Sequence, residues 1–522
     1  MPIEIGGNQP KVTFLQPAKV FTWPKLLSPS LSDLFFLFIT AWLFLVSPVG
    51  WQRLLLDADT ALHIRVGQYV LSTGTVPHQD LFSFGKPGQA WYAFEWLSET
   101  MYAAAYNLAG LKGVALLGGV LVSLYVTVLL KYTVWKGASG LFALVVMLMA
   151  TTGASIHFHA RPHLVTMLFL AIALWIMEHH RRRGGRLIWT LVPLTALWAN
   201  FHGGFFIFFA LLGLRVLGCA AEAWFWPEIR SERRREAVLL ACLAAACALA
   251  SLANPYGLGL HRHILELLSS PWTMKNVSEF KSPSFRTEEL YTAMLLLFAG
   301  LACITSLIRK RNLVEPLWIV FLAYCSLTSV RHTTIFLLVA SPVIAVELSA
   351  WWASLAAGQP KTSLLRMFND VSQQLATGLA GTSLFIPLIV AGLALAPGIR
   401  WPDAFPEGWV PVPFVEANAG RLANRRVFTS DQIADYMIFR NYPRQQVFFD
   451  SRHNYYGEKI GDEYLALSQG GPEWKNLLDK YAFDLILCPA DAPIASLVRA
   501  AGGWHVVDSN GKYILFERDG KS

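Results

Sequence analysis

Two acidic residues stand directly after the first strongly apolar segment of the chain, in the order Asp57-Ala58-Asp59. Carboxylates beside a bilayer gain nothing from the lipid, and this pair has no lysine neighbour, which favours a functional role. The chemistry that a carboxylate offers at such a place is general-base catalysis, the removal of a proton from a bound hydroxyl. The structural alternative is that Asp57 or Asp59 caps a helix through Ala61 to Leu71.

Histidine and arginine recur at the same ends of the later apolar segments. The candidates for substrate binding are His63, His159, Arg161, His163, His202, Arg331 and His332. The opposite ends carry mostly plain arginine and lysine, and this asymmetry is the strongest functional signal in the sequence. For any single residue a purely structural explanation competes with a binding role, because basic side chains at helix ends extend to the membrane interface. Arg161-Pro162, for example, also suits the first turn of a helix.

A metal site has to be weighed against these roles. Asp57, Asp59, His63, His159 and His163 are ligand types, and the last two have i, i+4 spacing. Proline interrupts that spacing, and hard divalent ions need more carboxylates than this stretch offers. The sequence therefore predicts no metal and no cofactor, with a divalent ion as the open alternative.

The elements that must position these residues are membrane helices. The chain is 54% hydrophobic and only 15% charged, with a mean hydropathy of +0.42. Apolar stretches of roughly 18 residues or more, the length that spans a bilayer as a helix, recur along most of the chain. We expect about eleven spans, at 31–50, 113–131, 139–157, 163–180, 187–201, 203–222, 236–253, 290–308, 313–330, 333–352 and 379–397.

The distribution of basic residues orients these spans, since arginine and lysine stay in the cytoplasm. The predicted cytoplasmic connections carry Lys131 and Lys136, Arg181–Arg183 with Arg186, Arg230 with Arg233–Arg235, Arg309–Arg311, and Lys361 with Arg366. Residues 1–30 then form a cytoplasmic segment, and 31–397 the transmembrane domain. Its first outer loop, 51–112, carries the acidic pair. Within it, 91–108 is either a further span or an amphipathic interfacial helix.

Residues 398–522 differ in kind and are expected outside the membrane as a small α/β domain. Short strands are predicted at Val427–Ser430, Gln446–Asp450, Phe483–Cys488 and Trp504–Val507, with helices between them, which favours a parallel sheet. Asn510 and Gly511 indicate a closing hairpin. The basic residues form no aromatic-interleaved patch, so nucleic acid is not an expected partner.

The acidic pair belongs to a longer pattern: Asp57-Ala58-Asp59-Thr60, His63, Gly67, Gly74, Val76-Pro77, Asp80, Phe82-Ser83 and Glu95-Trp96-Leu97. This pattern resembles bacterial mannosyltransferase- and arabinosyltransferase-like members of the C superfamily of glycosyltransferases, multi-span membrane enzymes that use polyprenyl-phosphate sugars. The tail segment Phe448–Arg452, with Tyr455 and Tyr456, also looks like part of such proteins. The Trp-Trp-Asp-Tyr-Gly motif of oligosaccharyltransferases is absent, which disfavours transfer of a whole oligosaccharide to asparagine.

The resemblance implies an inverting transfer from a polyprenyl-phosphate-linked sugar to a hydroxyl of a glycan, lipid or protein acceptor, at the outer face of a bacterial inner membrane. Phosphate leaves as a stable anion, so one base suffices. Asp57 or Asp59 would be that base, and the other would orient the acceptor or the base. Arg161 and Arg331 would bind the phosphate, and His159, His163, His202 and His332 would add hydrogen bonds.

Two other functions stay open. An O-antigen-ligase-like polymer transferase would also work outside on lipid-linked sugars, using arginine and histidine in place of an acid. A transporter or scaffold is disfavoured because transporters place charges near the membrane midplane, where these spans carry few besides Arg215.

Overall fold

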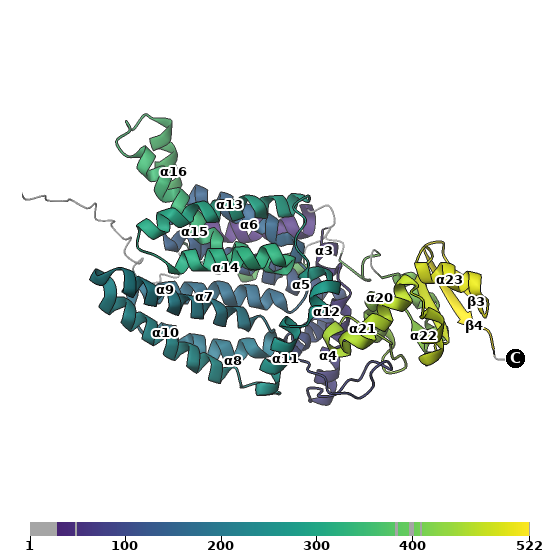
Figure 1. Cartoon of the computed structure of the whole chain (residues 1–522). Helices are drawn as coiled ribbons and strands as arrows, with labels where there is room; N and C mark the ends of the chain where they lie inside the picture. Colours follow the sequence, from purple (N-terminus) through teal and green to yellow (C-terminus); the bar gives the residue numbers. More distant parts are fainter. Residues whose placement is uncertain (1–28, 47–49, 382–384, 396–400, 408–409, 521–522) are drawn as a thin grey trace, which may run out of the picture.

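The computed structural model describes residues 29–46, 50–381, 385–395, 401–407 and 410–520. It consists of a long helical bundle with a smaller α/β domain at one end (Figure 1). The predicted cytoplasmic segment 1–30 lies almost wholly outside the described residues, as do parts of the first and last predicted spans. The predicted domain boundaries therefore stay predictions.

The bundle is built from helices that follow the apolar segments. Their bounds are α2 Leu31–Ala41 with the π-helical turn η1 Trp42–Val46, α5 Trp96–Lys136, α6 Gly140–Ala154 with η2 Ser155–His157, α7 His163–Arg183, η3 Arg186–Thr190, α8 Leu191–Phe201, α9 Phe205–Phe225, η4 Pro227–Ile229, α10 Arg230–Ala250, α13 Glu288–Arg309, α14 Val314–Thr328, η6 Val330–His332, α15 Thr333–Ala356, α16 Leu364–Leu379 and α17 Phe385–Leu395. In the described parts of the chain, 6 helices are long and apolar enough to cross a membrane. The protein is therefore a multi-pass membrane protein, while the count of about eleven spans remains a prediction.

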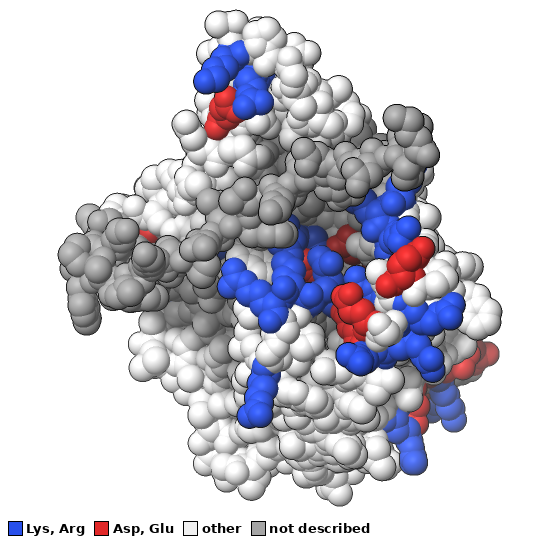
Figure 2. All heavy atoms as spheres, turned by 90° about the vertical axis from the view of Figure 1, so that its left-hand side faces the viewer, with Lys and Arg blue, Asp and Glu red and all other residues white. Residues whose placement is uncertain are grey.

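Figure 2 faces the end of the bundle opposite the α/β domain, and Lys and Arg side chains gather there. They include the last turn of α7, where Arg181 and Arg182 both pair with Glu178. Lys136 pairs with Glu315 close by the same end. This clustering agrees with the predicted placement of the basic connections, although the side of the membrane they face is still an inference from charge.

The first outer loop folds against the bundle through α3 Gln52–Leu55 and α4 Asp59–Thr73. Its residues Trp96–Leu108 are helical and continue into the span through a kink at Ala109 and Gly110, where φ is −148° and +60°. The predicted segment 91–108 is helical only from Trp96 onward, and the kink sets this helix apart from the rest of α5. It lies very close to α4, because a Cβ on Gly67 would come within 1.9 Å of the Glu99 carbonyl oxygen.

The connection between α10 and α13 contributes the short helices α11 Leu258–Leu268, α12 Pro271–Asn276 and η5 Ser278–Phe280. Figure 1 shows α11 and α12 at the end of the bundle that meets the α/β domain. Trp272 joins the two parts, since its indole N–H donates to Asp462 at 2.8 Å.

The α/β domain holds a four-stranded sheet of order β1-β2-β4-β3. Its elements are α18 Val412–Ala417, α19 Ala419–Leu422, β1 Val427–Phe428, α20 Asp431–Asn441, α21 His453–Gln469, α22 Trp474–Lys480, β2 Leu485–Pro489, α23 Pro493–Ala501, β3 Trp504–Ser509 and β4 Tyr513–Arg518. Only β1 and β2 are parallel, while β4 pairs antiparallel with both β2 and β3. The prediction of a parallel sheet was therefore wrong, because the predicted closing hairpin inserts β4 between β2 and β3.

The predicted strand at Gln446–Asp450 is not part of this sheet. Val447 instead pairs with the first outer loop: its amide N–H donates to Phe82 O at 2.9 Å, and Phe84 N–H donates to Val447 O at 2.8 Å. The apolar residues that suggested a sheet strand are buried, with Val447, Phe448 and Phe449 at most 2% exposed. This segment joins the α/β domain to the outer loop.

A buried charge network secures the same junction. Arg452 Nη1 lies 2.7 Å from Asp80 Oδ1 of the outer loop, and Arg452 Nη2 lies 2.6 Å from Asp450 Oδ2. Tyr456 donates its hydroxyl to Asp450 at 2.6 Å, and the Arg452 guanidinium lies 4.6 Å from the centre of the Trp91 ring. The tail segment that resembled part of a known family thus positions its domain over the loop that carries the acidic pair.

Candidate functional site

A cavity of about 770 Å³ lies between the bundle and the α/β domain. Its walls come from the first outer loop, residues 155–161, the α8–α9 turn at His202, the α11–η5 connection, the α14–α15 turn, and the segments of the α/β domain around Asp431 and Ser451–Asn454. Predicted site residues that line it are Asp57, Asp59, His63, His159, Arg161, His202 and Arg331. Their gathering follows from the packing of helix ends, since each lies at or beside the end of a helix.

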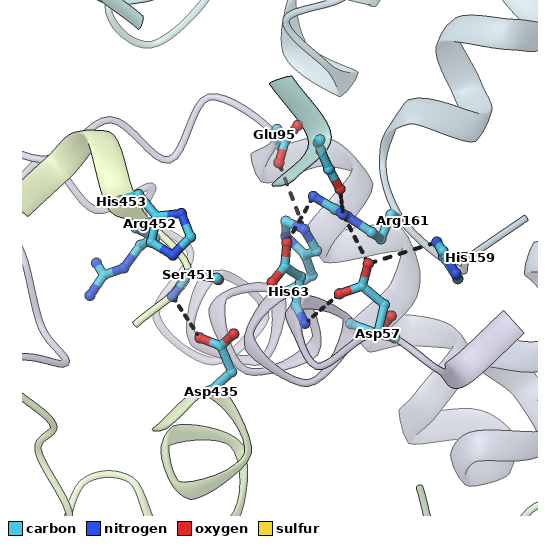
Figure 3. Close-up of polar contacts among 12 residues, drawn as sticks. Asp57, His63, Glu95, His159, Arg161, Asp435, Ser451, Arg452 and His453 are labelled. Carbon is cyan, nitrogen blue, oxygen red and sulfur yellow. Dashed lines mark hydrogen bonds and ion pairs between the residues drawn. The ribbon is translucent and has the colours of Figure 1, made fainter. Parts of the chain in front are cut away.

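Arg161 lines this cavity and is shared by three carboxylates; Figure 3 shows it beside Asp57. Its Nη1 lies 2.9 Å from Asp57 Oδ2 and 2.7 Å from Glu279 Oε1, and its Nη2 lies 2.8 Å from Asp59 Oδ2. The backbone next to Arg161 is hydrogen-bonded to the first outer loop, since the N–H of the preceding residue, Ala160, donates to Leu54 O at 2.7 Å. The cluster carries more negative than positive charge.

Asp57 also accepts the backbone N–H of Asp59 at 3.0 Å, at the residue where α4 begins. The structural and functional interpretations of the acidic pair are therefore compatible. The helix starts at Asp59, two residues earlier than the predicted segment, with Ala58 rather than an aspartate as its N-cap.

The two aspartates differ in acidity. Burial alone would raise the pKa of Asp57, but the Arg161 guanidinium and His159 outweigh it, so its pKa lies below the ordinary value. Burial raises the pKa of Asp59; Arg161 opposes this shift and the Asp57 carboxylate reinforces it, and the net pKa lies above the ordinary value. Asp59 is consequently the stronger base of the pair.

His63 and His202 flank Glu95, the residue before α5. His63 Nε2 lies 3.8 Å from Glu95 Oε2, and His202 Nε2 lies 3.3 Å from Glu95 Oε1. Burial raises the pKa of Glu95 to about 7, whereas burial together with Arg331 and Arg161 lowers that of His202 to about 3. For His63, burial lowers the pKa, but the hydrogen bond with Glu99 and the charge of Glu95 outweigh it, so the net pKa is raised.

The tautomer of His202 follows from its surroundings. Gly204 N–H donates to its Nδ1 at 2.9 Å, so that nitrogen is an acceptor. The Thr166 hydroxyl, itself accepting the Trp198 indole N–H at 2.7 Å, lies 2.8 Å from the same nitrogen and donates to it. The ring proton therefore sits on Nε2 and points to Glu95.

The remaining histidines predicted to bind substrate differ in whether they line the cavity. His159 Nδ1 lies 3.8 Å from Asp57 Oδ2, and its pKa is lowered by burial. His163 donates from Nε2 to the His157 carbonyl at 2.7 Å. Neither His163 nor His332 is among the residues described as lining the cavity, so the structure does not bring these two to the cavity wall.

Arg331 differs from Arg161 in its partners. It lines the cavity, and its guanidinium lies 4.5 Å from the centre of the Phe280 ring. None of the described carboxylates forms a direct ion pair with it, although the charge of Glu279 acts on it at longer range. Arg331 is therefore a cavity-lining cation without a direct carboxylate partner among the described residues.

Several site residues escaped the sequence prediction. Glu95 belonged to the family pattern without a role, and Glu99 and Glu279 were single acids in loops that gave no sign of a site. The α/β domain adds His453, whose Nε2 lies 2.8 Å from Asp431 Oδ2, and fully buried Asp435, which lies below His63 and Arg452 in Figure 3. Burial, with the charges of Asp59 and Asp450, raises the pKa of Asp435 well above its ordinary value.

Comparison with known proteins finds similar structures but no similar sequence. No family model matches the chain, and no curated protein matches it. The oligosaccharyltransferase AglB from Archaeoglobus fulgidus, in complex with an inhibitory peptide and a dolichol-phosphate, superposes with a TM-score of 0.55 at 12% identity, over 92% of this chain and 73% of AglB. The apo form of the oligosaccharyltransferase from that organism gives 0.52 at 11% identity, over 93% and 74%.

ArnT from Cupriavidus metallidurans, bound to undecaprenyl phosphate, superposes with a TM-score of 0.46 at 11% identity, over 93% of this chain and 96% of ArnT. At such identities structural likeness is informative about fold, and function has to be argued from the site. The chain therefore shares the fold of the oligosaccharyltransferase AglB, as the resemblance of its first outer loop to membrane glycosyltransferases led us to expect at the level of fold.

Proposed function

We propose that this protein transfers a sugar from a polyprenyl-phosphate donor to an acceptor hydroxyl at the extracytoplasmic face of the membrane, with inversion at the anomeric carbon. The observation that carries the proposal is the acidic pair on Arg161, facing a cavity of about 770 Å³ between the helix ends and the α/β domain. A lipid-linked sugar keeps its tail in the bilayer and its head at the interface, which is where this cavity would lie.

Asp59 is the proposed base. A general base has to be ionised yet retain affinity for a proton, and the raised pKa of Asp59 suits that task better than the lowered pKa of Asp57. Asp57 is then a positioning residue, since it binds the Asp59 backbone N–H at 3.0 Å and the shared guanidinium at 2.9 Å.

Arg331 is the proposed phosphate-binding residue. The sequence suggested Arg161 and Arg331 equally, but three carboxylates already contact Arg161 at 2.7–2.9 Å. An anion approaching Arg161 would also approach those carboxylates, whereas Arg331 lines the cavity without a direct ion pair to a described carboxylate. Its planar donors can bind two phosphate oxygens at once. His159 and His202 border the same cavity and can supply further hydrogen bonds.

The proposed reaction is a single displacement. The acceptor O–H gives its proton to Asp59 while its oxygen forms a bond to the anomeric carbon. The bond from that carbon to the phosphate oxygen breaks, its electrons go to the leaving group, and polyprenyl phosphate departs as an anion. Because the leaving group is a stable anion, no acid has to protonate it, unlike the two-carboxylate arrangement of glycoside hydrolases.

The α/β domain is proposed to form the acceptor side of the cavity. Asp431, Ser451, His453 and Asn454 line the wall that faces the acidic pair, and they offer donors and acceptors suited to a hydroxylated molecule. The lipid tail of the donor has to leave toward the bundle, so the acceptor approaches from the domain side. The acceptor itself is a glycan, a lipid or a protein.

The test is sugar transfer by the purified protein in lipid, with a panel of labelled polyprenyl-phosphate sugars. Asp59→Asn should reduce transfer by about 10²- to 10⁴-fold, the usual contribution of a general base. The matched control is Asp370→Asn, a half-exposed surface pair with Arg366 on the predicted cytoplasmic helix α16. Undiminished transfer by Asp59→Asn and Asp57→Asn would contradict the proposal and favour an arginine and histidine mechanism like that of O-antigen ligases.

A further inference from the structure

A histidine and two glutamates converge at the base of the cavity, where α4 meets the start of α5. His63, Glu95 and Glu99 each place one potential ligand atom within 4.8 Å of the others. His63 Nδ1 lies 3.1 Å from Glu99 Oε1, and His63 Nε2 lies 3.8 Å from Glu95 Oε2. Among the described residues this is the one group of three such side chains with the spacing of a metal site.

The packing of the two helices brings this group together. Glu95 and Glu99 have i, i+4 spacing and share one face at the start of α5. His63 meets that face from α4, and Gly67, one turn further along α4, permits the close approach. The ligand set therefore comes from α4 and from the start of α5 with its N-cap residue Glu95.

Burial gives an independent reason to expect a cation here. The Glu99 side chain is 5% exposed, and its Oε2 is buried without a hydrogen-bond partner. A buried carboxylate oxygen without a donor is costly. A single imidazole supplies at most one positive charge beside the two carboxyl groups. A divalent ion would balance both glutamates and give Glu99 Oε2 a partner.

We propose that His63, Glu95 and Glu99 bind a zinc-class divalent metal ion. A nitrogen ligand with two carboxylates suits zinc and similar transition metals, whereas magnesium and calcium prefer oxygen ligands throughout. Zinc binds such ligands at about 2.0–2.2 Å, which puts the ligand atoms about 3.4 Å apart. Only one ring nitrogen of His63 can bind the ion, and the three ligand atoms lie within 4.8 Å of one another. Binding therefore requires these side chains to move closer together by about 1 Å.

His202 is not a ligand in this arrangement, although its Nε2 lies 3.3 Å from Glu95. Its Nδ1 accepts hydrogen bonds from Gly204 and Thr166, so its Nε2 carries the proton and has no lone pair to offer. The ion would thus have three protein ligands and an open fourth position, the arrangement that distinguishes catalytic from structural zinc sites. The sequence missed this group because it drew its acidic ligands from the Asp57–Asp59 end of the loop.

Metal content tests the proposal without any sugar donor. The full-length protein is purified in lipid, stripped with a chelator, incubated with Zn²⁺ and desalted, and its zinc is counted. Co²⁺ is used in parallel, because protein-bound cobalt absorbs visible light. We expect one bound equivalent for the wild type, loss of the bound ion in Glu99→Gln and in His63→Gln, and no competition by Mg²⁺.

The matched control is Glu266→Gln, an exposed carboxylate on α11 at the edge of a side pocket next to the cavity. It should retain the ion, and thermal unfolding of the metal-free proteins should show that the variants are folded. A wild type that retains no zinc or cobalt would overturn the proposal, as would unchanged retention in both variants. Because no sugar transfer is measured, either result leaves the proposed transferase activity as a separate question.

Discussion

Arg161, in the loop before α7, holds Asp59 of the first outer loop through a contact of 2.8 Å between Nη2 and Oδ2. The same guanidinium holds Asp57 and Glu279, so one cation fixes three carboxylates from two parts of the chain, the first outer loop and η5. This arrangement sets the geometry and the acidity of the proposed base.

Arg161→Gln should change the acidity of the two aspartates. Without the guanidinium the pKa values of Asp57 and Asp59 both rise, because Arg161 lowers each of them. The acidic limb of the pH–rate profile should therefore move to higher pH than in the wild type, and transfer at neutral pH should fall. An unmoved acidic limb would contradict the role of Arg161 in setting the acidity of the base.

The wild-type enzyme should lose activity in acid. The base has to be ionised, and its pKa is raised in the folded protein, so transfer should be full at pH values well above the pKa of Asp59. It should then decline, as the pH falls, at a higher pH than an ordinary aspartate would give. The measurement is kcat/KM for the donor against pH, with thermal unfolding at each pH as the control for folding. A rate that stays level down to the ordinary range of aspartate would contradict this prediction.

Arg331→Gln should weaken the use of the donor. Removing the charge proposed for phosphate should raise the KM for polyprenyl-phosphate sugar, by roughly tenfold or more for the loss of about 1.5–3 kcal/mol from a charged hydrogen bond. Arg331→Lys should recover only part of this loss, since lysine cannot bind two oxygens in a plane. The control is Arg262→Gln on α11, an exposed arginine of the same end of the bundle. Equal KM values for Arg331→Gln and this control would exclude Arg331 from donor binding.

Arg452→Met should loosen the α/β domain from the outer loop. It would leave Asp80 and Asp450 buried without their cation, and breaking such a pair costs about 3–5 kcal/mol. Limited proteolysis or hydrogen exchange should then show earlier opening of the domain junction. Arg518→Met, which removes a half-buried arginine paired with exposed Asp479, is the control in the same domain. Equal protection in the two variants would contradict the role of Arg452 at the junction.

The sequence predicted the place of the site better than its internal contacts. Asp57, Asp59, Arg161 and Arg331 were found because membrane topology puts helix ends of one side together, and charges there are rare enough to stand out. The sequence could not predict which of these charges form ion pairs. Glu279, for example, contacts Arg161 although 118 residues separate them, and a single acid in a loop does not indicate such a partner.

The α/β domain shows the same limit. The closing hairpin at Asn510 and Gly511 is a local signal and was confirmed, with Gly511 at φ +82°. The position of β4 between β2 and β3 depends on tertiary packing, which a strand pattern does not encode. Gln446–Asp450 looked like a sheet strand because burial, whatever its cause, selects apolar residues. Here the outer loop, not the sheet, buries them.

The most direct test of the central claim is the rate of sugar transfer from polyprenyl-phosphate donors by the wild type, Asp59→Asn and Asp57→Asn in lipid. We expect a loss of about 10²- to 10⁴-fold for Asp59→Asn with donor binding retained, and a smaller loss for Asp57→Asn, which removes a positioning contact. Wild-type rates in both folded variants would contradict a carboxylate base in the first outer loop.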